Sequence, residues 1–135
     1  MYSLSHICFY TSNLDTMVNF YVRLFKTKII HKFLNNENIM YGAFIEIGNN
    51  TLIEIFNSQI EGKQKETCGF KHFCIETKDI NETVKHLKKL SLNVEITRGK
   101  SDNTLQCHIE DPDGNKIEFQ EIDDKSDLKF FSSFS

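Results

Sequence analysis

The chain has 135 residues, of which 39% are hydrophobic and 26% charged, with a formal net charge of −3. This length and composition fit one globular domain that buries a core, and they exclude a disordered or fibrous chain. The negative charge and the scattered Lys and Arg exclude a nucleic-acid surface, and no apolar run approaches the roughly twenty residues that cross a bilayer.

The first half of the sequence predicts a strand, a helix and three further strands. Alternation along the first strand, 4–10, places Ile7 and Phe9 on one face, which the helix should cover. Ser12 or Asn13 is the expected cap of that helix. Its apolar stripe recurs every three or four residues and comprises Leu14, Met17, Val18, Tyr21, Leu24 and Phe25. The three later strands are predicted at 27–33, 40–47 and 51–56.

The second half repeats this plan after a polar linker at 57–69. A strand is predicted at 70–77 and a helix at about 80–91, capped by Asp79 with Glu82 three residues later. The apolar stripe of this helix comprises Ile80, Thr83, Val84, Leu87 and Leu90. The last three strands are predicted at 93–98, 104–110 and 115–122, the final two joined by the turn Asp111-Pro112-Asp113-Gly114-Asn115.

The two halves share residues as well as a plan. The runs Ser5-His6-Ile7-Cys8 and Lys71-His72-Phe73-Cys74 match at a constant offset of 66 residues. Each half also ends on a Glu between apolar residues, Glu54 in the first and Glu118 in the second. We therefore expect an α+β chain that forms a single domain from two βαβββ modules and a tail, with bounds at 4–56, 70–122 and 123–135.

Two His and two Glu at matching places indicate a metal site. Strand alternation places all four on faces opposite the helix-packing residues. Two imidazoles and two carboxylates suit a divalent ion of intermediate softness and leave positions open for water or substrate. For any one of these residues, a hydrogen-bonded or solvated side chain is the alternative. Because both types recur together, we favour a site made by His6, Glu54, His72 and Glu118.

The sequence at this point resembles the vicinal oxygen chelate superfamily, and specifically glyoxalase I, over about residues 4–122. The motifs that carry the resemblance are Ser5-His6-Ile7, Leu52-Ile53-Glu54, Lys71-His72-Phe73 and the run from Asp111 to Glu118. The resemblance implies a cupped, eight-stranded mixed sheet, commonly in a homodimer. It also implies one divalent metal ion per site, nickel or cobalt before zinc, on the same two His and two Glu.

The activity implied by the resemblance is lactoylglutathione lyase-like. The hemithioacetal of methylglyoxal and a thiol, a 2-oxoaldehyde-thiol adduct, becomes an S-D-lactoylthiol through an enediolate whose charge the metal stabilises. Glu118 matches the family's usual base and Glu54 is its counterpart. Substrate contacts are expected at four further residues, Tyr10, Asn57, Arg98 and Lys100.

Two departures from the family pattern leave the thiol open. Glyoxalase I usually carries an Arg four residues after its first His ligand, where this chain has Tyr10. It also carries an Asn four residues after the first Glu ligand, where this chain has Ser58 with Asn57 one place early. A thiol other than glutathione therefore remains an alternative. So do a thiol transferase for a fosfomycin-type antibiotic, an epimerase, and a non-catalytic binder like the bleomycin-resistance proteins.

Several further expectations concern the rest of the chain. No signal peptide is apparent and the four Cys are interpreted as reduced thiols, which indicates a cytoplasmic protein. Three His without a counterpart in the other module are interpreted as structural or solvated, namely His31, His86 and His108. The Phe residues of the tail are expected to dock on a partner. Whether one chain or two build each site is left open.

Overall fold

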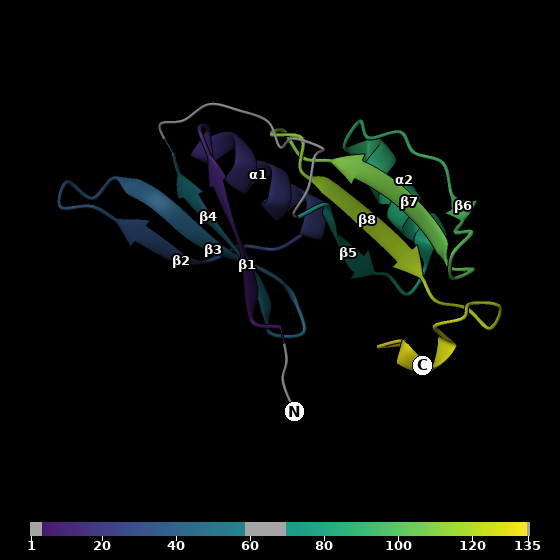
Figure 1. The fold of residues 1–135 in the computed structure, drawn as a ribbon. Coiled ribbons are helices and arrows are strands. Elements are labelled where there is room, and N and C mark those ends of the chain that lie inside the picture. Colours follow the sequence, from purple (N-terminus) through teal and green to yellow (C-terminus); the bar gives the residue numbers. More distant parts are fainter. Residues whose placement is uncertain (1–3, 59–69, 135) are drawn as a thin grey trace. The chain divides into compact units, whose positions relative to one another are not determined.

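The computed structural model describes residues 4–58 and 70–134. The chain divides into two compact units, residues 1–64 and 65–135, which we call module one and module two and describe separately. Each module contains one α-helix and one four-stranded sheet (Figure 1). In the described residues, no helix is long and apolar enough to cross a bilayer.

Module one has the predicted βαβββ order. Its elements are β1 (His6–Thr11), α1 (Leu14–Phe25), β2 (Ile29–Leu34), β3 (Met40–Gly48) and β4 (Thr51–Asn57). The strands lie in the order β1-β4-β3-β2, with β1 parallel to β4 and the other neighbours antiparallel. The α+β class and the mixed sheet are thereby confirmed for this module.

The helix α1 covers one face of that sheet, as its apolar stripe predicts. Asn13 caps it, since its Oδ1 accepts a hydrogen bond from the amide of Thr16 at 3.3 Å. Lys26 ends it in a left-handed conformation with φ 50°. Five stripe residues are buried, and the sheet residues buried in the core are Ala43, Ile45, Ile53 and Ile55. The opposite face of the sheet, which carries Glu54, is left uncovered by α1.

Module two repeats the order with shorter strands. Its elements are β5 (His72–Glu76), α2 (Ile80–Lys89), β6 (Thr97–Arg98), β7 (Leu105–Glu110), β8 (Lys116–Glu121) and the short helix η1 (Lys129–Phe131). The strands lie in the order β5-β8-β7-β6, with β5 parallel to β8. The strands of the two modules pair in two separate four-stranded sheets, so the continuous eight-stranded sheet implied by the resemblance stays a prediction.

The strand predicted at 93–98 is wrong over most of its length. Only Thr97 and Arg98 pair with β7, opposite Gln106 and Leu105. The chain leaves α2 by a turn in which Ser91 has φ 64° and the amide of Leu92 donates to Leu87 O. The alternation of Leu92, Val94 and Ile96 led to the prediction, but such alternation reports burial and does not guarantee a hydrogen-bonded neighbour.

Local polar contacts position the ends of the elements in module two. Asp79 caps α2, since its Oδ1 accepts from the amides of Asn81 at 3.0 Å and Glu82 at 3.2 Å. The side chain of Glu82 pairs with Lys85 at 2.9 Å. The turn before β8 closes around the buried Asp111, whose Oδ1 accepts from two backbone amides.

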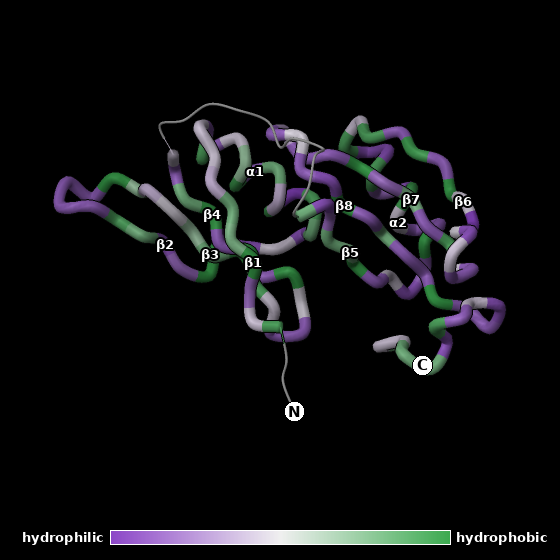
Figure 2. The backbone as a smooth tube through the Cα atoms, in the orientation of Figure 1, coloured by the Kyte–Doolittle hydropathy of each residue, from purple (hydrophilic) through white to green (hydrophobic). Residues whose placement is uncertain are grey.

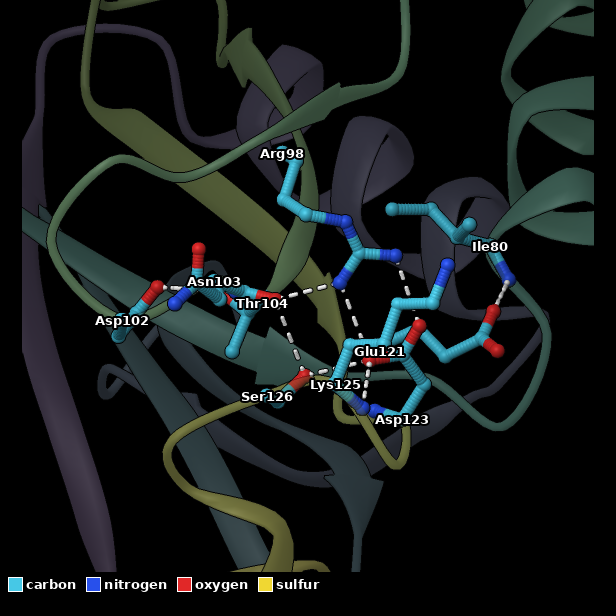
Figure 3. Close-up of polar contacts among 9 residues, drawn as sticks. All are labelled: Ile80, Arg98, Asp102, Asn103, Thr104, Glu121, Asp123, Lys125 and Ser126. Atoms are coloured by element: carbon cyan, nitrogen blue, oxygen red, sulfur yellow. Dashed lines mark hydrogen bonds and ion pairs between the residues drawn. The ribbon is translucent and has the colours of Figure 1, made fainter.

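A polar cluster attaches the tail to the loop between β6 and β7 (Figure 3). Arg98 makes two hydrogen bonds to Asp123, at 2.8 and 3.1 Å, and a third to the carbonyl of Asn103. The Ser126 hydroxyl bonds Asp123 at 2.8 Å and the Asn103 carbonyl at 3.2 Å. These contacts, which we call the tail clasp, hold the segment after β8 against its own module.

Beyond the tail clasp the chain presents aromatic rings to solvent. Phe130 and Phe131 are 86% and 79% exposed, and in Figure 2 the segment just before the C-terminus changes between hydrophilic and hydrophobic colours. Ser132 and Ser133 bond to the carboxylate of Glu76 on β5. Docking of these rings on a partner stays a prediction.

The predicted linker, 57–69, begins with two described residues. Asn57 is the last residue of β4, and the amide of Ser58 donates to Thr11 O at 2.6 Å. The rest of the linker, 59–69, lies outside the described residues. The three Cys that the structure describes are free thiols, Cys8, Cys74 and Cys107.

Candidate metal and proton-transfer site

The first candidate pair lies on the open face of module one. Parallel pairing of β1 and β4 sets Cys8 opposite Glu54, so His6 lies two residues along the same face. The Nε2 atom of His6 is 3.8 Å from Oε1 of Glu54. The Glu54 side chain is only 15% exposed, and the ring of Phe44 meets the His6 imidazole edge-on at 5.7 Å. An imidazole and a carboxylate are therefore brought together in an aromatic setting.

The second pair occupies the equivalent register in module two. Cys74 lies opposite Glu118 across β5 and β8, as Cys8 lies opposite Glu54. Nε2 of His72 is 3.2 Å from Oε2 of Glu118, whose side chain is 12% exposed. The sequence prediction that each module aims one His and one Glu at its open face agrees with both sheets.

Two further residues contact Glu118 and were not predicted from the sequence. His108 lies directly opposite Glu118 on β7, and its Nε2 is 3.3 Å from the same Oε2 atom. Gln106, in the amide orientation that satisfies both of its ends, donates to Glu118 Oε1 at 3.1 Å and accepts from the amide of Gly99. The available signal was alternation along 104–110, which puts 106 and 108 on one face. Register across strands was needed to bring them to Glu118.

The two cysteines beside these pairs are held in the thiol form. Burial, with a hydrogen bond to Glu54 and the charge of that carboxylate, raises the pKa of Cys8 to about 11. Burial and the charge of Glu118 raise the pKa of Cys74 to about 12. At neutral pH neither is a thiolate, so neither is activated as a nucleophile.

The donor chemistry of the two pairs fits a divalent metal. Bonds from imidazole nitrogen and carboxylate oxygen to such ions are about 2.0–2.2 Å long, so two neighbouring ligands of one ion lie roughly 3 to 3.5 Å apart. The His72–Glu118 separation falls in that range and the His6–Glu54 separation is slightly wider. Within residues 4–58 and 70–134, no group of three or more His, Cys, Asp or Glu side chains is arranged to hold a metal. Each module thus brings together two of the four predicted ligands.

Comparison of the sequence with a protein-family model identifies the family of this chain. The model described as the Glyoxalase/Bleomycin resistance protein/Dioxygenase superfamily matches residues 3–119. The chain belongs to this superfamily. The description of this superfamily joins glyoxalases and dioxygenases with bleomycin resistance proteins, so membership identifies the scaffold and leaves the activity open.

The curated relatives of this superfamily member are named lactoylglutathione lyases. The chain is 28% identical over 119 residues to a lyase of Arabidopsis thaliana, with 84% of this chain and 42% of that protein covered. It therefore spans about two fifths of the length of this plant relative. It is 26% identical to a lyase of Neisseria meningitidis, with 86% of this chain and 88% of that protein covered.

Solved structures of the glyoxalase superfamily share the fold. A glyoxalase family protein from Enterococcus faecalis superposes with a TM-score of 0.76 at 21% identity, covering 88% of this chain and 97% of that one. A lactoylglutathione lyase from Agrobacterium tumefaciens gives 0.67 at 21%, covering 88% and 92%. A fosfomycin resistance protein from Listeria monocytogenes gives 0.69 at 15%, covering 95% and 99%. At these identities the likeness concerns the fold alone.

The four predicted substrate contacts lie in different settings. Tyr10 is on the open face of module one, where its ring is 6.5 Å from that of Phe56. Asn57 follows Ile53 and Ile55 in the alternation of β4, which puts it on the face opposite Glu54. Arg98 is engaged in the tail clasp, and Lys100 is exposed in the loop after β6. Strand alternation therefore places Tyr10 on a face that carries one of the pairs, and the four substrate contacts stay predictions.

Proposed function

We propose that this chain is a metal-dependent lyase of the glyoxalase I type. Its reaction converts the hemithioacetal of methylglyoxal and a thiol to the S-D-lactoylthiol. The observation that supports this most strongly is the His–Glu pair, repeated at the same register position on the open face of each module. Sequence similarity to curated relatives named lactoylglutathione lyases supports the proposal independently of the geometry.

In this proposal His6, Glu54, His72 and Glu118 hold one divalent ion per site, nickel or cobalt before zinc. A bound ion supplies positive charge that stabilises negative charge on two adjacent substrate oxygens. The ligand set is complete when both modules contribute, either from one chain or from two chains of a homodimer. Because each module holds an incomplete set, removal of either His should lower metal affinity.

We assign the proton transfer to Glu118. A carboxylate beside the reacting carbons can take a proton from one carbon and return it to the next. His72 and His108 both contact Oε2 of Glu118, and Gln106 contacts Oε1, so both oxygens of the carboxylate are oriented. Glu54 has fewer polar neighbours, and we give it the role of pseudo-symmetric counterpart.

The experiment that tests this proposal combines metal analysis with a turnover assay. Purified protein is stripped of metal, reconstituted with nickel, cobalt or zinc, and assayed with methylglyoxal and glutathione. We expect one ion per site, activity that depends on it, and loss of both in His72→Ala. A protein that binds none of these ions would contradict the metal site, and a loaded but inactive protein would contradict the lyase reaction.

A second candidate keeps the metal and changes the substrate. Tyr10 occupies the place where glyoxalase I usually carries a carboxylate-binding Arg, which favours a thiol other than glutathione. The fold likeness to a fosfomycin resistance protein makes thiol transfer to such an antibiotic the natural comparison. Assays with glutathione, an uncharged thiol and fosfomycin on one metal-loaded preparation separate these substrates.

We also propose that the protein is a cytoplasmic homodimer whose partner is a small molecule, with no nucleic acid or membrane involved. The proposal follows from the family resemblance, the net charge of −3 and the reduced thiols. Light scattering on the purified protein tests the dimer. A monomer that is fully active at assay concentration would contradict it.

A further inference from the structure

Aromatic rings cover the open face of module one. Phe33 lies at the centre, with its ring 5.4 Å from Phe44, 5.0 Å from Phe56 and 6.0 Å from Tyr41. Tyr41 stacks on Phe56 at 6.2 Å with planes 19° apart, and Tyr10 continues the series beyond Phe56. All these separations are typical of interacting rings. We call these five residues the aromatic face.

Two backbone features build this surface. A Cβ atom at Gly42 would lie 2.4 Å from Cδ1 of Phe56, so the ring rests directly on the glycine backbone. The pairing of β2 and β3 shifts register after Phe33, which leaves Tyr41 without a partner opposite it. Such a bulge redirects a side chain, and the ring contacts of Tyr41 show that it joins the same face. The position of these rings is therefore fixed by the backbone of β3 and by packing between the rings.

The aromatic face is continuous with the proposed metal ligands. Phe44 lies opposite Glu54 in the pairing of β3 and β4, and its ring meets His6. A ligand whose two oxygens bind an ion held by His6 and Glu54 would therefore lay its remaining atoms over the rings. Tyr10 and Tyr41 are 74% and 44% exposed, so this aromatic area is open to solvent in module one.

The charged residues around the aromatic face indicate the charge of the group that would bind there. By strand alternation, the acidic residues on this side of the described sheet are Glu46 and Glu54, and Lys32 lies on the other side, opposite Ala43. No Lys or Arg of β1–β4 shares the face by this alternation. Glutathione carries two carboxylates that need cationic partners, and on this face β1–β4 offer them only the imidazoles of His6 and His31. An uncharged flat ring matches it in shape, polarity and charge.

We propose that the aromatic face of module one binds an uncharged aromatic group, which forms the non-reacting part of the substrate. This inference rests on the proposed function, because it places the two reacting oxygens on the ion that His6 and Glu54 would help to hold. It specifies the substrate class as an aromatic compound with two adjacent oxygens. The recognition surface then belongs to module one, and the polar surroundings of Glu118 belong to module two.

The test uses two non-reacting ligands that share a two-oxygen head group. Mandelohydroxamic acid carries a phenyl ring where lactohydroxamic acid carries a methyl group. Their affinities for the nickel-loaded protein are measured by calorimetric titration. Because the ring is buried only in the first case, we expect mandelohydroxamic acid to bind about 30-fold more tightly. Equal affinities would overturn the aromatic inference and leave the metal site standing.

Matched variants locate the effect. Phe33→Leu and Phe56→Leu keep apolar volume but remove a ring from the aromatic face, and we expect the affinity ratio to fall below about fivefold. Phe130→Leu is the control, because it removes an exposed Phe ring of the tail outside the aromatic face. The affinity ratio of the two hydroxamates should be unchanged in this variant. An unchanged ratio in both aromatic-face variants would overturn the inference.

A second measurement separates this inference from the proposed function. If neither hydroxamate binds the nickel-loaded protein, the metal site is wrong. The ring is then tested alone by NMR titration of metal-free protein with benzyl alcohol. Shifts of the Tyr10, Tyr41 and Phe56 ring signals, without equal shifts at Phe130, support the aromatic face. Equal shifts at all four, or none, overturn it.

Discussion

The open faces of the two modules differ although their backbones and His–Glu pairs correspond. The residue opposite the Glu on the antiparallel neighbour is Phe44 in module one and His108 in module two. The ring of Phe44 meets an imidazole and other rings, whereas His108 contacts the carboxylate of Glu118. Register thus determines where a side chain lies, and residue type determines what it does there.

This difference indicates that the two modules have different functions, proton transfer in module two and substrate recognition in module one. A carboxylate with polar contacts at both oxygens is held in one orientation, which suits proton transfer. A face of stacked rings offers area and shape but no charge to neutralise, which suits recognition.

Replacing each Glu in turn separates the two pairs most strongly. Glu118→Gln should lower turnover about 1,000-fold, because the amide cannot accept the proton, while most of the metal is retained. Glu54→Gln should lower turnover much less. Turnover and metal content are measured on the same preparations. Near-normal turnover of Glu118→Gln would contradict its assignment as the base and remove the proposed division.

One glycine in each module provides a comparison of packing. Gly42→Ala should destabilise the protein by about 2 kcal/mol, because the new Cβ meets the Phe56 ring and the Ile55 carbonyl. Gly99→Ala should cost less, about 1 kcal/mol, because it meets the side-chain ends of Gln106 and Asp102, which can shift at the loss of a hydrogen bond, and no ring or backbone atom. Urea unfolding checks both. Equal losses would show that the aromatic face is not tightly built.

Exchanging the residues opposite each Glu sharpens the comparison directly. His108→Phe gives module two the residue that module one carries, and kcat should fall about tenfold because Glu118 loses one oriented contact. KM and metal content should stay near wild type, which a general structural defect would not produce. The matched exchange Phe44→His should leave kcat close to wild type. A larger kcat loss in Phe44→His would reverse the assignment of roles.

The tail clasp, which module one lacks, gives the smallest effect and a pH dependence. Hydrogen bonds from Arg98 and Ser126 hold the pKa of Asp123 well below its ordinary value of 3.8. The charged form is therefore favoured by folding, so this contribution is present above pH 3.8 and is lost as pH falls toward the lower folded pKa. Asp123→Asn should lower the urea midpoint slightly at pH 7, and the difference from wild type should shrink at about pH 2. A difference that grows on acidification would contradict the ion pair.

How far each element followed from the sequence depended on how local its cause was. The Asn13 and Asp79 caps and the Asp111 turn lie within a few residues of the groups they bond, so short patterns predict them. The strand at 93–98 was wrong because pairing with β7 is a tertiary matter. The ion pair of Arg98 was not predicted, because the Asp123 carboxylate that it bonds is 25 residues away along the chain.

The candidate site divides in the same way. The repeat and the strand alternation were enough to select His6, Glu54, His72 and Glu118 and to assign their faces. The neighbours of those residues, including His108, Gln106 and Phe44, came only from register between antiparallel strands. The convergence of the four ligands on one ion remains a prediction for metal analysis to test.

Short-range periodicity in the sequence was enough to predict that this protein repeats a βαβββ plan. The same periodicity predicted that each copy directs one His and one Glu to the face opposite its helix. The tertiary structure alone decided that one pair lies among rings and the other among polar groups. The physical reason is that the surroundings of a side chain in a sheet come from neighbouring strands, whose register the spacing along one strand does not encode.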